Sequence, residues 1–274
     1  MDLTTIAERV EAEVTELLGA VTPDQARAAL GMAVEHIGGG VVISLRDDPT
    51  GGHFNRVLGL GITEPVTARV VAGVLDFHRR QGSPACTFQI PPHLLPADWD
   101  DIVAAHGLIP GSTTVKFAGE VDAVKPASTD LRVGPVGDDE IDTWSALVWE
   151  LFGVPGPDFP AVTAAAARTR NYQAFAAWDG AEMVAVAALY VNGEAGQLNS
   201  AATRETHRRR GVQAALIAAR TAHAAGAGCR WVVSETGKPR TEGGNPSLNN
   251  MARAGLTPLY DRPEWVWRPD VQVR

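Results

Sequence analysis

The sequence predicts a mixed α/β protein built from two consecutive domains, and three observations support this fold class. The chain has 274 residues, whereas one domain usually takes about 100–200 residues. Segments typical of strands alternate with segments of helical periodicity, as in layered α/β domains. The alternation stops once, in the polar segment 121–130 (VDAVKPASTD), and then begins again, so we expect a linker there.

The first half is expected to begin with two helices. Apolar residues recur at helical spacing over 2–19, and Thr22-Pro23 is typical of a helix start, so a second helix is expected as far as about Ile37. The next expected elements are strands at 41–45 and 54–62, a helix after a cap residue at Thr63, a strand at 85–90, a helix at 96–106 and a strand at 113–119.

The second half repeats this alternation in a longer form. Asp179-Gly180 predicts a tight hairpin between two of its strands. The expected elements are a strand at 131–136, helices at 138–152 and 161–169, strands at 172–180, 181–193 and 194–203, a helix at 212–228, a strand at 229–235, a helix at 246–254, and strands at 256–260 and 264–268.

The charge and the cysteine content exclude several classes of protein. The net charge is −8, and residues 1–130 carry all of it, because they hold 17 acidic and 9 basic side chains. Such an acidic half disfavours nucleic-acid binding. No apolar run reaches the roughly 18 residues of a membrane span, and the acidic, amphipathic start is unlike a secretory signal. Cys86 and Cys229 form no disulfide framework, so we expect a cytoplasmic protein.

The most informative stretch for chemistry is 201–215 (AATRETHRRRGVQAA). A strand ends there, a basic loop follows, and a helix begins just after Gly211. The free N–H groups and partial positive charge of a helix N-terminus, together with a glycine that allows close approach, favour a pyrophosphate site. A solvated basic loop is the alternative. Patterns for triphosphate, dinucleotide, serine-hydrolase and metal sites are absent from the sequence.

The segment 208–214 (RRRGVQA) resembles the acyl-CoA pyrophosphate loop of the GCN5-related N-acetyltransferases (GNAT), whose pattern is Gln/Arg-x-x-Gly-x-Gly/Ala. Gln213 stands where Gly or Ala is usual. The order of elements over 131–268 is also similar to that fold. The resemblance implies two GNAT-like domains in tandem, each a central mixed sheet flanked by helices, with residues 126–274 forming the acyl-CoA-binding acetyltransferase domain. Residues 1–125 resemble a degenerate copy, because Glu64 and Pro65 at the corresponding turn oppose a phosphate.

The resemblance implies acetyl-CoA as the co-substrate and no metal. The cofactor-binding residues that it implies are Ala201, Ala202, Thr203, Arg208, Arg209, Arg210, Gly211, Val212, Gln213, Ala214 and Asn245. Main-chain groups would bind the pyrophosphate and the pantetheine arm, and a strand amide would face the thioester oxygen. An unrelated α/β domain remains the alternative for the first half.

The catalytic residues are less clear from the sequence. Glu235, at the end of a strand beside the expected gap, is the candidate general base, with a surface carboxylate as the alternative. The family's usual Tyr acid is replaced by Met251, which leaves the acid unassigned. Ser247 and Asn250 are weak substitutes, and either could instead be a helix cap or a solvated residue. Weaker candidates are Glu150, Glu194, Asn199, Glu205 and His207, and Trp149, Phe152 and Tyr172 would line an acceptor pocket or pack in the core.

The expected function is transfer of an acetyl group from acetyl-CoA to a primary amine of a small molecule, by direct attack in a ternary complex. The alternatives are a non-catalytic acyl-CoA-binding sensor or interaction module, and an acyltransferase that uses a longer acyl-CoA. No nucleic acid or membrane partner is expected. The acceptor amine, the acyl chain length and the oligomeric state stay open, with a homodimer as one option.

Overall fold

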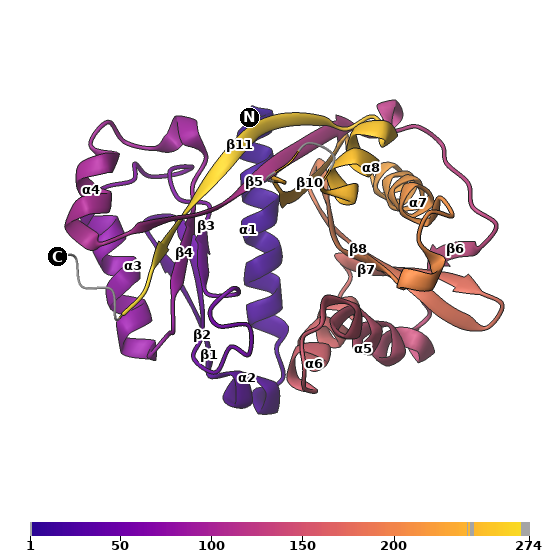
Figure 1. Ribbon diagram of the computed structural model, residues 1–274, viewed down its shortest axis with the longest axis horizontal. Coiled ribbons are helices and arrows are strands. Elements are labelled where there is room, and N and C mark those ends of the chain that lie inside the picture. Colours follow the sequence, from indigo (N-terminus) through magenta and orange to yellow (C-terminus); the bar gives the residue numbers. More distant parts are fainter. Residues whose placement is uncertain (1, 240, 242–243, 270–274) are drawn as a thin grey trace.

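The computed structural model describes residues 2–239, 241 and 244–269. Their strands form one 11-stranded mixed sheet with the order β1-β2-β3-β4-β11-β5-β10-β9-β8-β7-β6. The two halves of the chain form two lobes, and helix α1 (Leu3–Val21) stands between them (Figure 1). The mixed sheet flanked by helices confirms the predicted fold class.

The elements follow the predicted alternation in both lobes. The first lobe contains α2 (Asp24–Leu30), β1 (Met32–Ile37), β2 (Gly40–Leu45), β3 (Arg56–Leu58), α3 (Ala68–Gln81), β4 (Cys86–Gln89), α4 (Trp99–His106) and β5 (Ile109–Glu120). The second contains β6 (Arg132–Pro135), α5 (Ile141–Phe152), α6 (Asp158–Ala167), β7 (Tyr172–Asp179), β8 (Glu182–Asn192), β9 (Ala195–Thr203), α7 (Val212–Gly226), β10 (Trp231–Gly237), α8 (Pro246–Ala254) and β11 (Thr257–Trp267).

The helix predicted to reach Ile37 is wrong, because α2 ends at Leu30. Gly31 takes the left-handed conformation with φ 58° and ends the helix, as glycine does at many helix C-termini. The following residues then pair with β2 through Met32↔Leu45, so pairing with a distant strand overrides the local helical pattern.

Three further boundaries differ from the prediction. The strand expected at 54–62 shortens to β3, since Gly59 and Gly61 turn the chain with positive φ. Helix α3 begins at Ala68 and is capped by Thr67, not by Thr63. The two strands expected at the C-terminal end are one strand, β11, which is interrupted only by shifts of register.

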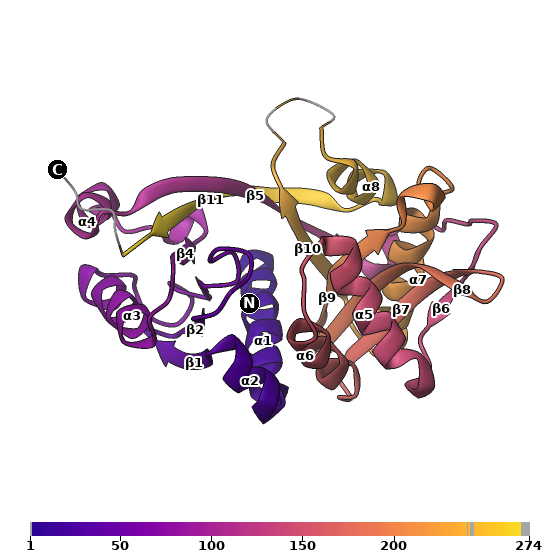
Figure 2. The same ribbon diagram turned by 60° about the horizontal axis from the view of Figure 1, so that its bottom comes forward.

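The long strands β5 and β11 join the two lobes. β11 lies between β4 and β5, and β5 lies between β11 and β10. The last strand of each half therefore pairs with the sheet of the other half, and Figure 2 shows the two strands side by side across the top of both lobes. This exchange brings side chains of the first half next to those of β10.

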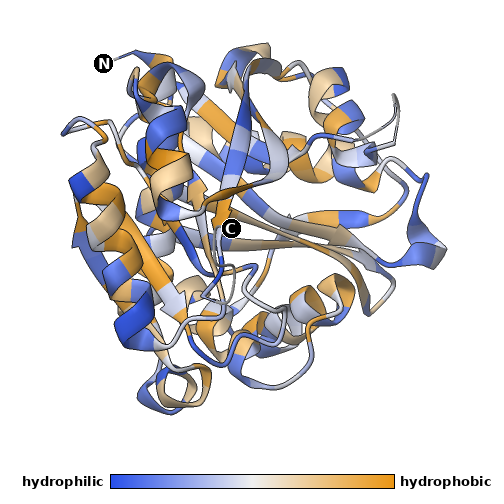
Figure 3. Ribbon diagram, turned by 60° about the vertical axis from the view of Figure 1, so that its left-hand side comes forward, coloured by the Kyte–Doolittle hydropathy of each residue, from blue (hydrophilic) through white to orange (hydrophobic). Residues whose placement is uncertain are grey.

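The hydrophobic core follows both lobes and reaches α1. Hydrophobic residues lie along the sheet-facing sides of the helices, and hydrophilic residues lie on their outer sides (Figure 3). The largest cluster of buried residues includes Ile6 and Val14 of α1 together with Trp144 of α5 and Phe159 of α6. Helix α1 is thus packed by both lobes. No helix in the described part of the chain is long and apolar enough to cross a membrane.

Candidate functional site

A gap opens between β9 and β10 in the second lobe. The two strands pair in parallel only over Ala195–Gln197 and Trp231–Val233, and the pairing ends there. A pocket of about 210 Å³ fills the gap, lined by residues of β9, β10, α7 and α8. Among them are Ser200, Ala201, Gln213, Arg220, Glu235 and Asn250. This is the gap that the GNAT resemblance predicts for the thioester.

A β-bulge interrupts β9 beside this gap. Val186 pairs with Ala202 and Ala188 pairs with Asn199, so Ser200 and Ala201 together oppose a single residue of β8. Ser200 has φ 51°. A bulge leaves its extra residue outside the ladder of hydrogen bonds, so main-chain groups here can face a ligand instead of a neighbouring strand. Such a donor could stabilise an oxyanion.

The basic loop before α7 has the backbone of an anion site. Arg209 and Gly211 both take positive φ, at 65° and 76°, which turns successive N–H groups toward the start of the helix. Gly211 is the N-cap of α7 and provides no side-chain cap for the N–H groups of the first turn. In the first lobe, by contrast, Thr67 caps α3 by accepting a hydrogen bond from the N–H of Val70 at 3.2 Å.

The three loop arginines have different surroundings. Arg208 and Arg209 are exposed. Arg210 forms ion pairs with Asp130 and with Asp179, the latter at 2.9 Å, and its hydrogen bonds with these carboxylates raise its pKa above the ordinary value. Arg210 is therefore already neutralised by two carboxylates, which favours a role in ordering the loop. Its predicted contact with phosphate stays a prediction.

The side chains of Gln213 and Asn245 each connect two elements of the site through hydrogen bonds. Gln213 donates a hydrogen bond to Thr203 Oγ1 at 2.7 Å, which links α7 to the end of β9. Asn245 Oδ1 accepts from the N–H of Ser247 at 2.9 Å, and its amide donates to Thr236 Oγ1 at 2.9 Å. Asn245 is thus the N-cap that fixes α8 to β10, and its contact with the cofactor arm stays a prediction.

Glu235 lies where two pockets meet. It lines the gap between β9 and β10, and it also lines a second pocket, of about 140 Å³, between the lobes. Gln197 Nε2 donates to Glu235 Oε2 at 2.6 Å, and Lys116 Nζ lies 3.4 Å from the same oxygen. Oε1 has no hydrogen-bond partner among the described residues, so it is available to a ligand.

Glu235, which is partly exposed, joins four buried charged residues in a group that we call the seam cluster. Its members are Glu8 and Glu11 of α1, Lys116 of β5, Glu235 of β10 and Arg262 of β11. Arg262 bonds Glu8 at 2.9 Å and Glu11 at 2.7 Å, and Lys116 bonds Glu11. The cluster holds three carboxylates and only two cations, so one negative charge is in excess.

This imbalance shifts the pKa values of Glu11 and Glu235, the two carboxyl groups that hydrogen-bond Lys116, in opposite directions. Burial and the charge of Glu11 raise the pKa of Glu235 above its ordinary value, and these effects outweigh Lys116 and Arg262. Burial would also raise the pKa of Glu11, but Arg262 and Lys116 lower it more strongly. Glu11 is therefore held as a carboxylate, whereas Glu235 exchanges a proton closer to neutral pH, as a general base requires.

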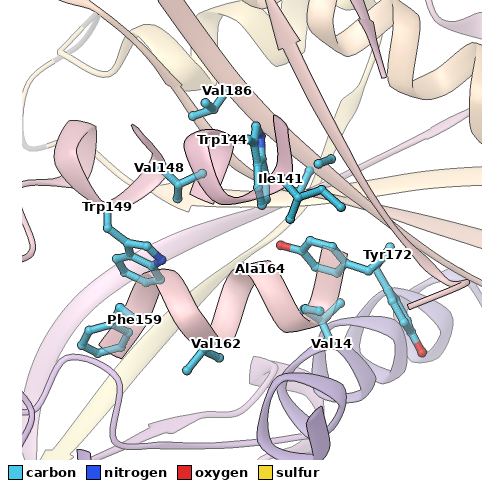
Figure 4. Packing of buried hydrophobic residues seen from close by; sticks show 14 of the residues in the cluster. Val14, Ile141, Trp144, Val148, Trp149, Phe159, Val162, Ala164, Tyr172 and Val186 are labelled. Atoms are coloured by element: carbon cyan, nitrogen blue, oxygen red, sulfur yellow. The ribbon is translucent and has the colours of Figure 1, made fainter. Parts of the chain in front are cut away.

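The pocket between the lobes is lined mainly by apolar residues. Phe54 of the first half lies 5.5 Å from Trp149 and 5.0 Å from Phe159, measured between ring centres. Figure 4 shows Trp149 next to Phe159, with Val162 beside them. Tyr172 also lines this pocket and donates to Asn199 Oδ1 at 2.9 Å, and burial raises its pKa to about 12. Phe152 lines the other pocket instead.

Most of the weaker catalytic candidates lie away from the gap or take part in other contacts. Glu150 pairs with Arg204 at 2.6 Å, His207 lies 3.3 Å from Asp179, and Glu205 lies 3.5 Å from Arg208, so all three make polar contacts around the loop. The remaining positions are exposed Glu194, Asn199 in both pockets, and Ser247, Asn250 and buried Met251 in the gap. Residues 2–239, 241 and 244–269 contain no group of three potential metal ligands.

Several residues of the site were missed by sequence reasoning. Lys116 stands in the apolar segment VKFAG, and Glu11 lies among the apolar positions of the first helix, so an unusual buried charge was a visible signal. Arg220 is buried in α7 and donates to the carbonyl oxygens of Ala188 and Asn199, at 2.9 and 3.2 Å. Burial lowers its pKa to about 9. No sequence pattern around Arg220 indicates that its side chain lies at the gap.

Comparison with known proteins supports the same fold. Residues 141–242 match the sequence profile of the acetyltransferase (GNAT) family. A GCN5-related N-acetyltransferase from Kribbella flavida superposes with a TM-score of 0.62 at 15% identity, over 97% of this chain and 96% of that one. A tandem GNAT protein from the clavulanic acid biosynthesis pathway gives 0.61 at 14% identity, over 95% and 96%. A search of the curated proteins finds no match.

The fold of the whole chain is therefore that of full-length GCN5-related N-acetyltransferases, one of which is a tandem GNAT protein. Within this fold, residues 141–242 are the part that is similar in sequence to the acetyltransferase (GNAT) family. The resemblance predicted from the RRRGVQA loop and from the order of elements is confirmed, and the fold supports acyl transfer in general.

Proposed function

We propose that the protein transfers an acetyl group from acetyl-CoA to a primary amine of a small molecule, by direct attack in a ternary complex. The observation that carries this proposal is the position of Glu235, between the β9–β10 gap and the pocket between the lobes. A donor in the gap and an acceptor in the other pocket would meet at this carboxylate.

The cofactor would be bound mainly by the backbone. The N–H groups of Arg209 to Ala214 would hold the pyrophosphate at the start of α7, with charge from Arg208 and Arg209. Main-chain groups of Ala201 to Thr203 would contact the pantetheine arm, and an amide at the β9 bulge would stabilise the oxyanion. The capped start of α3 supports a first half, residues 1–125, that has lost its phosphate site, beside an acetyltransferase domain at 126–274.

The reaction requires one proton to leave the ammonium before attack. Glu235 accepts that proton, directly or through water, and the neutral amine attacks the thioester carbon. A C–N bond forms, the C–S bond breaks, and CoA leaves as a thiolate, while the attacking nitrogen loses its second proton to that thiolate or to water as the amide forms. Buried Met251 cannot donate a proton to it, and the buried Arg220 cation in the gap favours negative charge on the departing sulfur.

A steady-state assay of CoA release across a panel of primary amines tests this proposal. Turnover that is lost in Glu235→Gln supports it. Tight acetyl-CoA binding without turnover on any amine would instead indicate the acyl-CoA-binding sensor. Competition between acetyl-CoA and longer acyl-CoAs shows which thioester is used, because the preferred donor has the higher kcat/KM.

A further inference from the structure

The pocket between the lobes contains a cation that the reaction does not use. Arg56 of β3 lines this pocket, and its Nε is buried without a hydrogen-bond partner. No ion pair joins Arg56 to a carboxylate within the described part of the chain. Arg56 is only partly buried, and its unpaired Nε leaves a hydrogen-bond donor that an anionic ligand in the pocket could use.

Arg56 and Glu235 both line the pocket, and they come from different levels along α1. Glu235 is level with Glu11, because Lys116 contacts both carboxylates. Gly19 of α1 lies against Val34 of β1, because a Cβ on Gly19 would touch the Val34 side chain. Val34 pairs with Ile43 of β2, and Ile43 pairs with Arg56 of β3. The backbone of Arg56 is therefore level with Gly19. Eight residues of α-helix separate these two levels by about 12 Å.

Much of the wall of this pocket is apolar. Val14 and Leu18 of α1 line it together with Phe54, Trp149 and Phe159. Their rings form one cluster across the two lobes. An alkyl or aryl chain would bury apolar surface against these residues.

We infer that the acceptor is an amino carboxylate in which an apolar spacer separates the amine from the carboxylate, an inference that rests on the proposed function. The amine lies at Glu235, beside the thioester, and the carboxylate pairs with Arg56 in the forked geometry that guanidinium groups favour. The spacer lies against the aromatic cluster. Both lobes are needed for recognition, because Arg56 and Phe54 come from the half that has no phosphate loop.

The experiment compares matched amines with and without the carboxylate. The probes are ω-aminooctanoate with n-octylamine and ω-aminohexanoate with n-hexylamine, each measured by calorimetric binding and by CoA release. In the wild type, an amino acid should bind about 10- to 100-fold more tightly than its plain amine, the range for a hydrogen-bonded ion pair. Arg56→Met should remove that preference and leave binding of the plain amine unchanged.

Arg80→Met is the matched control, because Arg80 is an exposed arginine on α3. It should retain the preference for the carboxylate, and thermal unfolding checks that both variants are folded. A preference that survives in Arg56→Met overturns the inference, as does the failure of every amino acid to bind. Binding that depends on Arg56 but gives no CoA release leaves the inference standing and refutes the proposed acetyl transfer. CoA release from the plain amines but not from the ω-amino acids supports the proposed acetyl transfer and refutes the inference.

Discussion

Lys116 and Glu235 face each other across the antiparallel strands β5 and β10, with Lys116 Nζ 3.4 Å from Glu235 Oε2. The two residues come from different halves of the chain, and the exchange of β5 into the second lobe makes them neighbours. Glu11 on α1 binds the same ammonium. Charged residues of the first half therefore act on the pKa of Glu235, in addition to its burial.

Replacing Glu235 with glutamine should remove the base and keep the shape of the site. We expect kcat/KM for the amine to fall by about 100-fold or more, the usual contribution of a general base. The dissociation constant of acetyl-CoA should stay the same, because the phosphate loop is untouched. Glu194→Gln, at an exposed position, is the control for both measurements. Full activity in Glu235→Gln would remove this residue from the mechanism.

Lys116→Met should move the acid limb of the pH–rate profile. The pKa of Glu235 is already raised, and the base acts only when deprotonated, so activity rises as the pH increases through that pKa. Without the nearby cation this pKa rises further, and the limb shifts to higher pH. Lys238→Met, on an exposed lysine just after β10, should leave the profile unchanged. A merely structural Lys116 would lower stability without moving the limb.

Glu11→Gln should destabilise the protein in a manner that depends on pH. The pKa of Glu11 is lowered in the folded state, so its carboxylate stabilises the fold above the ordinary glutamate pKa of 4.5, and this stabilisation is lost as the pH falls below that value. At neutral pH we expect a loss of about 3–5 kcal/mol in the free energy of unfolding, as for a broken buried ion pair.

Denaturant unfolding of wild type and Glu11→Gln at several pH values measures this difference, which should shrink toward acid pH. Glu16→Gln provides the control, because Glu16 is exposed on the same helix. A difference that is constant over the whole pH range would show that the ionisation of Glu11 does not stabilise the fold.

Gly211→Val should weaken acetyl-CoA binding by more than about tenfold, because a branched side chain prevents the close approach of phosphate to the start of α7. A Cβ at Gly211 would also lie 3.0 Å from the carbonyl oxygen of Ser128. Gly193→Val is matched in backbone strain, since Gly193 has φ 57° in open space. Equal affinities in the two folded variants would refute the phosphate-loop assignment.

Sequence reasoning reached the parts of the fold that depend on local pattern. Helix α7 follows Gly211, and β7 and β8 meet at Asp179-Gly180, because caps and tight turns are specified by a few adjacent residues. It failed where pairing with a distant strand decides the outcome. Met32–Ile37 became a strand by pairing with β2, and β11 became continuous by pairing with β4 and β5.

The candidate site also has parts that sequence reasoning predicted and parts that it missed. The phosphate loop, the gap and Glu235 were predicted because they lie in one contiguous region with a known order of elements. The partners of Glu235 were not, because Glu11, Lys116 and Gln197 come from three separate elements. Periodicity shows which side of a strand is buried, but not which side chain of another strand faces it.

The sequence by itself determined the class of fold, the loop that favours an acyl-CoA and the acidic character of the first half. Only the tertiary structure decided what that half contributes. Its strand β5 pairs with β10 of the second lobe, so Lys116 and Glu11 lie beside Glu235, and Arg56 lines the pocket between the lobes. The physical reason is that a pKa and a binding pocket both depend on distances between side chains, and those distances are fixed only when the whole sheet is assembled.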